Sequence, residues 1–145
     1  VVVMRLSQIH DTVKQGLATE LIRHARQTGV SAYVDEGLNH WSAAHISDTA
    51  QLYRLALEKY QPGARYHATA ESHIPFRLIA QTLGEGLGLP VASVPADEAM
   101  ARFGWLSSFV GRDMASHSSK TRERLGWVPT GPGLIEDLNG CFQQR

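Results

Sequence analysis

Short β-branched apolar runs alternate along the chain with segments whose apolar positions recur every three or four residues. A short apolar run is typical of a strand, and a continuous one is typical of a parallel strand covered on both faces. The predicted strands are Val1–Leu6, which we expect to be buried on both faces, Ser31–Val34, Ala64–Ala70 and Val91–Val94.

Apolar residues at helical spacing predict helices between these strands. Glycine, proline and N-capping residues mark several helix ends. The predicted helices are Leu17–Thr28, a segment from Ser47 to Pro62-Gly63, a segment from Pro75 to Leu87, Asp97–Phe103, Ser118–Leu125 and Leu134–Phe142. In the second of these helices, Ser47 is the predicted N-cap, and the apolar face carries Ala50, Tyr53, Leu57 and Tyr60. Residues 37–41 are expected to form a loop, and Trp105–Val110 shows no clear pattern. Strands that alternate with helices indicate the α/β class.

The 145 residues have the size and composition of one globular domain, residues 1–145. Apolar residues make up 43% of the chain and charged residues 19%, which excludes a disordered or fibrous protein. The sequence contains no repeat, no low-complexity tract and no linker.

Charge and cysteine content narrow the choice of partners and compartment. Lys plus Arg and Asp plus Glu number 14 each, and no Lys/Arg cluster stands out along the sequence, which argues against nucleic acid or an anionic membrane as a partner. No apolar run approaches the roughly 20 residues of a membrane span, and no basic segment precedes the apolar N-terminus as in a signal peptide. The single cysteine, Cys141, allows no intrachain disulfide, so we expect a cytoplasmic protein.

Three segments, in matching order and spacing, carry a family resemblance. Met4–Asp11 is similar to the motif Leu-Arg-x-x-Asn-Val-Tyr-Gly. Gly37–Ala50 is similar to a Gly-x-Gly/Asn loop followed by Val-His-Val-x-Asp-x-Ala, and Ser119–Pro129 to Ser-x-Lys-x-x-x-x-Leu-Gly-Trp-x-Pro. Together they resemble the C-terminal, substrate-binding half of the extended short-chain dehydrogenase/reductase family, the NAD-dependent epimerase/dehydratases. The resemblance implies a partial Rossmann-type sheet, made of its last parallel strands, with a small helical substrate domain.

The family's cofactor-binding and catalytic motifs are absent from this sequence. The Gly-x-x-Gly-x-x-Gly turn that holds the pyrophosphate of NAD or NADP is missing, and Gly84–Gly88 is interpreted as a helix end. None of the four tyrosines has a lysine four residues later, so the catalytic Tyr-x-x-x-Lys pair is missing too. We therefore predict no cofactor-binding residue, no catalytic residue and no redox activity for the chain alone.

The resemblance places Ser7, Gln8 and His10 on a loop that faces the nicotinamide and the substrate. Without a cofactor-binding half we expect no cofactor contact there, and these residues are candidates for a substrate pocket. An ordinary exposed loop at the end of a strand is the alternative.

Trp41 departs from the family, whose nucleotide-sugar enzymes usually have an arginine four residues before the position of His45, where it binds a diphosphate. An indole cannot pair with phosphate, so the resemblance implies a small apolar or aromatic carbonyl compound rather than a sugar nucleotide. Trp41 and His45 are thus candidate substrate-binding residues. The alternatives are that Trp41 packs in the core and that His45 is a structural histidine at a helix start.

No metal site is predicted, because the spacing of His40 and His45, or of His67 and His73, matches no standard ligand pattern. Cys141 is expected to pack in a helix interface rather than to act as a nucleophile. The aromatic residues Trp105, Phe109 and Trp127 are expected in the core.

Three functions remain open at this point. The chain is a truncated epimerase/dehydratase-like protein that binds a small molecule as a homo-oligomer, the substrate domain of a complete NAD(P)-dependent enzyme whose cofactor half lies elsewhere, or a structural or interaction module. Self-association is expected through Val1–Leu6, since one neighbour of this strand is Ala64–Ala70 and the other belongs to the missing half.

Overall fold

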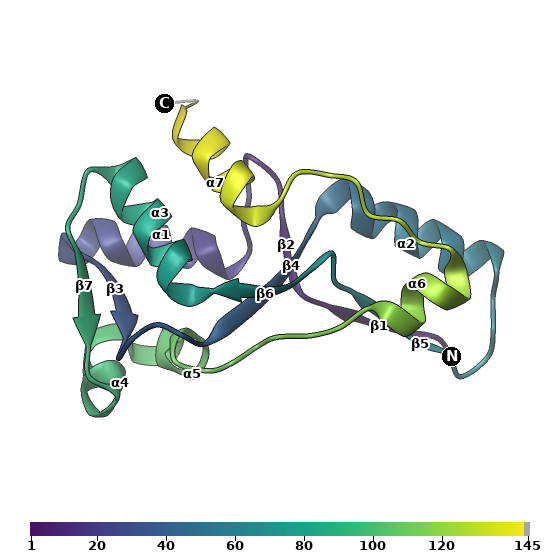
Figure 1. Cartoon of the computed structure of the whole chain (residues 1–145), viewed down its shortest axis with the longest axis horizontal. Coiled ribbons are helices and arrows are strands. Elements are labelled where there is room, and N and C mark those ends of the chain that lie inside the picture. The colour runs from purple at the N-terminus through teal and green to yellow at the C-terminus, as the bar shows by residue number, and fades with distance from the viewer. Residues whose placement is uncertain (144–145) are drawn as a thin grey trace.

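The computed structural model describes residues 1–143 and confirms the α/β class. The molecule is elongated, with two helix-covered ends joined by a central sheet (Figure 1). The strands are β1 Val3–Leu6, β2 Gln8–His10, β3 Ser31–Val34, β4 His40–His45, β5 Arg65–Ala68, β6 Glu71–Pro75 and β7 Val91–Val94. The α-helices are α1 Leu17–Thr28, α2 Ile46–Glu58, α3 Phe76–Leu87, α4 Ala99–Phe103, α5 Ser107–Val110, α6 Ser119–Leu125 and α7 Leu134–Gln143. Short 3-10 turns cover Ala96–Glu98 and Gly104–Leu106.

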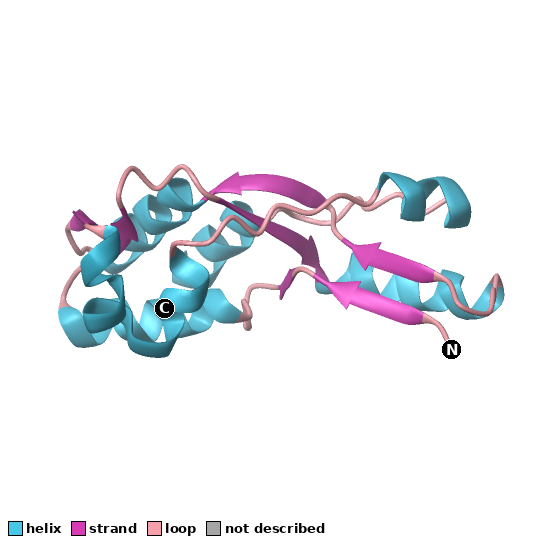
Figure 2. Ribbon diagram, turned by 90° about the horizontal axis from the view of Figure 1, so that it is seen from below, coloured by secondary structure: helices cyan, strands magenta, loops and turns pink. Residues whose placement is uncertain are grey.

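The strands form three small sheets. β1 pairs with β5 in parallel at the end that carries the N-terminus, where the two strands lie side by side (Figure 2). In the centre, β4 lies between the parallel strand β2 and the antiparallel strand β6, and β3 pairs with β7 in parallel at the far end. The predicted pairing of the first strand with the strand in residues 64–70 is confirmed.

Each end of the molecule has its own apolar core. At the far end, α1, α3 and α7 pack around Trp41, Phe76 and Ile79. At the N-terminal end, α2 and α6 cover one face of β1 and β5 around Tyr66 and Trp127.

The N-cap of α2 differs from the prediction. The helix begins at Ile46, and the cap is His45, whose extended backbone (φ −66°, ψ 148°) lets its Nδ1 accept the amide of Ser47 at 3.1 Å. The His45 imidazole thus accepts the hydrogen bond expected of a serine hydroxyl, and His45 stands at the helix start named in the structural alternative.

The apolar face predicted for α2 points outward. Its buried side chains include Leu52 and Ala56, whereas Tyr53, Leu57 and Tyr60 are 44%, 76% and 56% exposed. Leu52 and Ala56 are spaced four residues apart, as residues on the predicted face are. Helical spacing alone therefore does not tell which of the two faces of α2 packs on β1 and β5.

Two other predictions on burial are wrong. β1 is not covered on both faces within the described residues, because Val3 and Leu6 are 39% and 56% exposed while Met4 packs against the core. Trp105 is 59% exposed on a short 3-10 turn, whereas Trp127 and Cys141 are buried and Phe109 is partly buried, as expected.

Three local features were missed. Gln8 and His10 were expected on a loop, but they lie on the strand β2, whose pairing with β4 depends on contacts distant in sequence. The polar strand β6 lies inside residues predicted to connect a strand and a helix, and β4 begins within the predicted loop 37–41. β6 pairs with β4 through an irregular register around Trp41 and Ala43.

Candidate functional site

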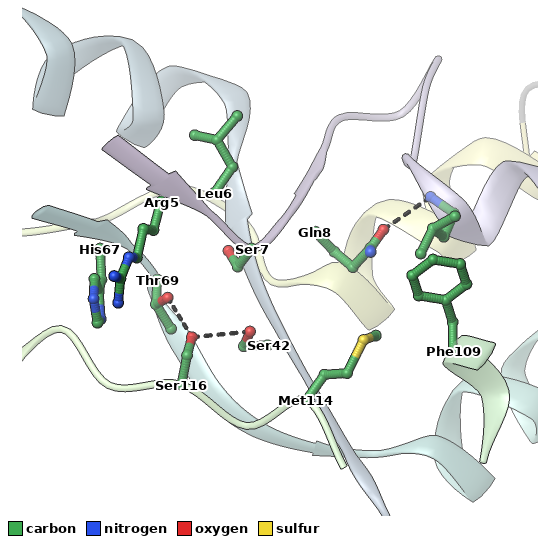
Figure 3. A pocket seen from close by; sticks show the side chains of 11 residues that line it. Arg5, Leu6, Ser7, Gln8, Ser42, His67, Thr69, Phe109, Met114 and Ser116 are labelled. Carbon is green, nitrogen blue, oxygen red and sulfur yellow. Dashed lines mark hydrogen bonds between the residues drawn. The ribbon is translucent and has the colours of Figure 1, made fainter. Parts of the chain in front are cut away.

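A cavity of about 420 Å³ lies where β1 and β5 end. Ser7 directly follows β1 and Thr69 directly follows β5, and both line the cavity. Figure 3 shows hydroxyl side chains at these strand ends and the apolar side chains of Phe109 and Met114 farther along the cavity. Leu17 also lines the cavity.

Residues 111–118, which connect α5 to α6, close one side of the cavity; we call this segment the strap. The amide of Met114 donates to the His40 carbonyl at 2.6 Å. The Ser116 hydroxyl lies 2.6 Å from that of Thr69 and donates to that of Ser42 at 3.0 Å. The strap thus brings Met114 and Ser116 to a site built on strands that lie far away in the sequence.

Asp113 helps to hold the strap on β4. Its Oδ1 accepts the backbone amide of His40 at 2.8 Å and lies 3.1 Å from the imidazole Nδ1 of His40. The backbone hydrogen bond, together with the nearby imidazole, lowers the pKa of the Asp113 carboxyl below its ordinary value.

The structure brings two of the predicted site residues, Ser7 and Gln8, to the cavity. The Ser7 hydroxyl donates to the Ala68 carbonyl at 2.5 Å, and Gln8 Oε1 accepts the amide of Leu17 at 2.9 Å. Gln8 therefore also caps the start of α1. Gly16 makes this contact possible, because a Cβ at this position (φ 58°) would lie 2.6 Å from Gln8 Oε1.

His10 and His45 lie together, but in a different place. The buried His10 donates from Nδ1 to Asp137 Oδ2 at 2.5 Å, and His45 Nε2 lies 3.5 Å from the same oxygen. Neither histidine lines the cavity at Ser7. This arrangement ties β2 and the start of α2 to α7.

Trp41 is in the core. Its side chain is fully buried, packs on Phe76 at 5.1 Å between ring centroids, and donates from Nε1 to the Phe109 carbonyl at 3.1 Å. The indole does not line the cavity, so the alternative given for Trp41, packing in the core, describes its position.

Most of the cavity wall was not found by sequence reasoning. The missed residues are Arg5, Leu6, Leu17, Ser42, His67, Thr69, Phe109, Met114 and Ser116. Arg5 is part of the motif in Met4–Asp11 and could have been chosen from it. The strap residues carry no recognisable pattern, and only the folded chain places them here.

The glycine-rich segment does not fit the pyrophosphate of a dinucleotide. Gly84 and Gly86 lie inside α3, where a Cβ would collide with Val91 and Phe142, so these glycines permit close packing. Gly88 is the left-handed C-cap of the helix (φ 67°), as the predicted helix end requires. Residues 1–143 thus offer no phosphate cradle in this segment.

Within the described part of the chain, no group of three or more His, Cys, Asp or Glu side chains has a geometry that could hold a metal ion. No helix between residues 1 and 143 has the length and apolarity needed to cross a membrane.

Comparison with known proteins identifies two curated relatives of unassigned function. The uncharacterized protein YLL056C of Saccharomyces cerevisiae is 45% identical over 134 residues, which is 92% of this chain and 45% of that protein. The uncharacterized protein C2A9.02 of Schizosaccharomyces pombe is 45% identical over 130 residues, 90% of this chain and 44% of that protein. The chain spans slightly less than half the length of these relatives. No family model matches it.

Solved structures match almost the whole chain. The ADP-L-glycero-D-manno-heptose-6-epimerase of Helicobacter pylori has a TM-score of 0.68 at 15% identity, over 99% of this chain and 43% of its own. The human epimerase family protein SDR39U1 with NADPH has a TM-score of 0.65 at 20% identity, over 99% of this chain and 48% of its own. A third match is DesIV, a dTDP-glucose 4,6-dehydratase of Streptomyces venezuelae with NAD and TYD bound. Its TM-score is 0.66 at 17% identity, over 99% of this chain and 42% of its own.

At these identities the structural likeness concerns the fold. The chain has the Rossmann-like α/β fold of part of the NAD-dependent epimerase and dehydratase structures, over slightly less than half of their length.

Proposed function

We propose that the chain is the substrate-binding part of an NAD(P)-dependent oxidoreductase or epimerase of the extended short-chain dehydrogenase/reductase type. The cavity beside Ser7 and Thr69 is its substrate site. A cofactor-binding half, on the same or another polypeptide, would bind NAD or NADP.

The position of the cavity carries this proposal. In open α/β sheets, ligands bind beyond the carboxyl ends of parallel strands. The parallel strands β1 and β5 both end at this cavity. Its volume of about 420 Å³ lies in the range of small-molecule sites, roughly 300–1,000 Å³.

Two further observations support the oxidoreductase or epimerase class. The chain has the fold of part of several NAD- and NADPH-containing structures. The yeast relatives match at 45% identity and extend well beyond the matched region, which leaves length for a second half.

The chain's own residues would bind and orient the substrate. Leu17, Phe109 and Met114 offer an apolar wall, which suits a small apolar or aromatic carbonyl compound. Trp41, from which such a ligand was inferred, does not line this cavity, so the apolar wall replaces it as the ground for this ligand class. The proton donor and the cofactor cradle would come from the other half, so we propose no redox activity for this chain alone.

The test is a binding screen of small aromatic carbonyl compounds against the isotope-labelled chain, read by NMR. We expect shifts at Ser7, Thr69 and Ser116. Met114→Trp fills the cavity while keeping the backbone hydrogen bond to His40, so it should abolish binding. Met100→Trp, a substitution at a 67% exposed position away from the cavity wall, is the matched control. Ligands that bind Met114→Trp as tightly as the unmodified chain would refute the proposal.

A second candidate is a stand-alone small-molecule-binding homo-oligomer. The observation in its favour is the edge of β1, which pairs with no strand among residues 1–143 on the side away from β5. In either case we propose a cytoplasmic protein, on the ground of its single cysteine.

A further inference from the structure

The charged groups and the larger apolar groups of the cavity lie at opposite ends. Phe109 and Met114 stand at one end with Gln8, whereas Arg5 and His67 stand at the other with Leu6 (Figure 3). Leu17, whose amide donates to Gln8, also lines the cavity. Arg5 and His67 are direct cross-strand partners on β1 and β5, so the backbone register fixes their proximity.

The hydroxyl groups between the two ends are engaged with one another and with the backbone. Thr69, Ser116 and Ser42 form a chain of hydrogen bonds, and Ser7 donates to the Ala68 carbonyl. The strongest polar groups left for a ligand are therefore cationic, since a guanidinium carries five N–H donors.

A second cavity of about 280 Å³ shares the His67 wall and continues this positive character; we call it the cationic cleft. Arg65 lies two residues before His67 on β5, on the same face of the strand, and α6 contributes Lys120 and Arg124. Neither cavity has an Asp or Glu in its wall.

These cations are not neutralised by the protein. The ion pairs within residues 1–143 lie elsewhere: His10 and His45 with Asp137, Arg23 with Glu20, His40 with Asp113, and Arg54 with Glu58. The whole chain has zero net charge. Four cations from β1, β5 and α6 line these two cavities, which have His67 in common, and form a local excess of positive charge.

We infer that the ligand of the cavity is an amphipathic small molecule with a terminal carboxylate or phosphate. Its apolar part lies against Leu17, Phe109 and Met114, and its anionic group lies at the Arg5 guanidinium. His67, whose Nδ1 donates to the His117 carbonyl at 2.8 Å, lies beside it and also lines the cationic cleft. This inference rests on the proposed function and adds the charge of the ligand to it. A polyanion such as nucleic acid is disfavoured, because the positive patch is confined to these cavities in a neutral chain.

The recognition is electrostatic at one end and apolar at the other, so the two ends can be tested separately. Three probes share one apolar body: phenylbutanol, phenylbutyrate and phenylbutyl phosphate. We expect phenylbutyrate to bind at least about tenfold more tightly than phenylbutanol. The phosphate should bind more tightly still, since its second charge reaches the field of Arg65 and Lys120. This preference should shrink when salt rises from about 0.05 to about 0.5 M.

Variants assign the preference to residues. Arg5→Gln should reduce the tenfold preference to less than about twofold, because it weakens the binding of the anions more than that of phenylbutanol. Lys120→Gln should remove the advantage of the phosphate over the carboxylate. Arg26→Gln, at an exposed arginine outside both cavities, is the control and should change nothing.

The outcomes separate this inference from the proposed function. Phenylbutanol could bind as tightly as both anions, with Met114→Trp abolishing its binding. The cavity would then remain the proposed substrate site, and the inference of an anionic ligand would be refuted. An anion preference that survives Arg5→Gln also refutes the inference. If no probe binds, or if Met114→Trp has no effect on binding, both the inference and the proposed function fail.

Discussion

His10 and Asp137 are 127 positions apart in the sequence, yet the imidazole Nδ1 lies 2.5 Å from a carboxylate oxygen in the interior. This contact fastens the last helix to the central sheet. His10 is 1% exposed and Asp137 is 2% exposed. If either side chain were removed, water could not reach the other to take over its hydrogen bond. Breaking a buried pair by removing one partner is much more costly than breaking an exposed one.

We therefore predict that Asp137→Ala lowers the free energy of unfolding by about 3 kcal/mol. The substitution leaves the buried His10 without its acceptor. Glu136→Ala, at the exposed neighbouring position, is the control and should change stability by less than about 0.5 kcal/mol. Urea unfolding measures both variants. Equal midpoints for the two would show that the buried pair contributes little.

A second prediction compares two tryptophans. Trp41 is fully buried and donates a hydrogen bond, whereas Trp105 is 59% exposed. Trp41→Ala should cost about 3–5 kcal/mol, because it opens a cavity and removes the hydrogen bond from the indole to the Phe109 carbonyl. Trp105→Ala should cost less than about 1 kcal/mol. Thermal unfolding followed by circular dichroism gives both values, and a stable Trp41→Ala would return Trp41 to the candidates for ligand binding.

The third prediction concerns the cofactor. The chain lacks the pyrophosphate turn, and its glycine-rich segment is packed against Val91 and Phe142. We expect neither NAD nor NADP to bind the chain with a dissociation constant below about 10 µM, which corresponds to roughly 7 kcal/mol. Calorimetric titration with each cofactor is the measurement, and tighter binding would reveal a cradle formed by other residues.

A fourth prediction is the acid response of the strap. The Asp113 carboxyl has a pKa below its ordinary value of 3.8. The main cause is the hydrogen bond that the backbone amide of His40 donates to it. A group whose pKa is lowered by folding stabilises the fold above its unfolded pKa, and that contribution is lost as the pH falls through the folded pKa. The strap should thus loosen only below pH 3.8. A carbon-detected NMR titration of the carboxyl group checks this, and a pKa at or above the ordinary value would contradict it.

How far the sequence predicts this molecule depends on whether the signal is local. Helices such as α1 and α3 follow from apolar spacing and from Gly29 and Gly88, which act within one turn. The strand β6 was missed because its residues are mostly polar and its pairing with β4 depends on contacts distant in sequence.

The candidate site shows the same division. Ser7 and Gln8, which follow a strand within a recognisable motif, were predicted as candidates, and they line the cavity. The cations Arg5, Arg65, Lys120 and Arg124 are spread over 120 residues, so no cluster is visible in the sequence, and only the pairing of β1 with β5 and the docking of α6 gather them. Burial of Trp41 likewise depends on α3 and α5, which the sequence does not place beside it.

The last prediction is self-association through β1. This strand has one neighbour, β5, among residues 1–143, and its other edge offers a row of backbone donors and acceptors. Such an edge invites pairing with another chain, and Arg5 is the only charged residue on it. The side chains of Val3 and Leu6 are 39% and 56% exposed, which adds an apolar surface that monomers seldom keep. A two-fold dimer that pairs two copies of β1 in antiparallel fashion closes both edges at once.

Light scattering over a dilution series from about 100 to about 1 µM tests this dimer, because the mass should fall toward that of one chain as dilution crosses the dissociation constant. Val3→Lys places a charge on the exposed face of the edge strand and should shift the mass to 15.9 kDa at all concentrations. Val13→Lys, at a 72% exposed valine outside the strand, is the matched control and should leave the dimer intact. If the unmodified chain is a monomer at every concentration and Val3→Lys does not change its mass, the chain does not pair with itself through this edge.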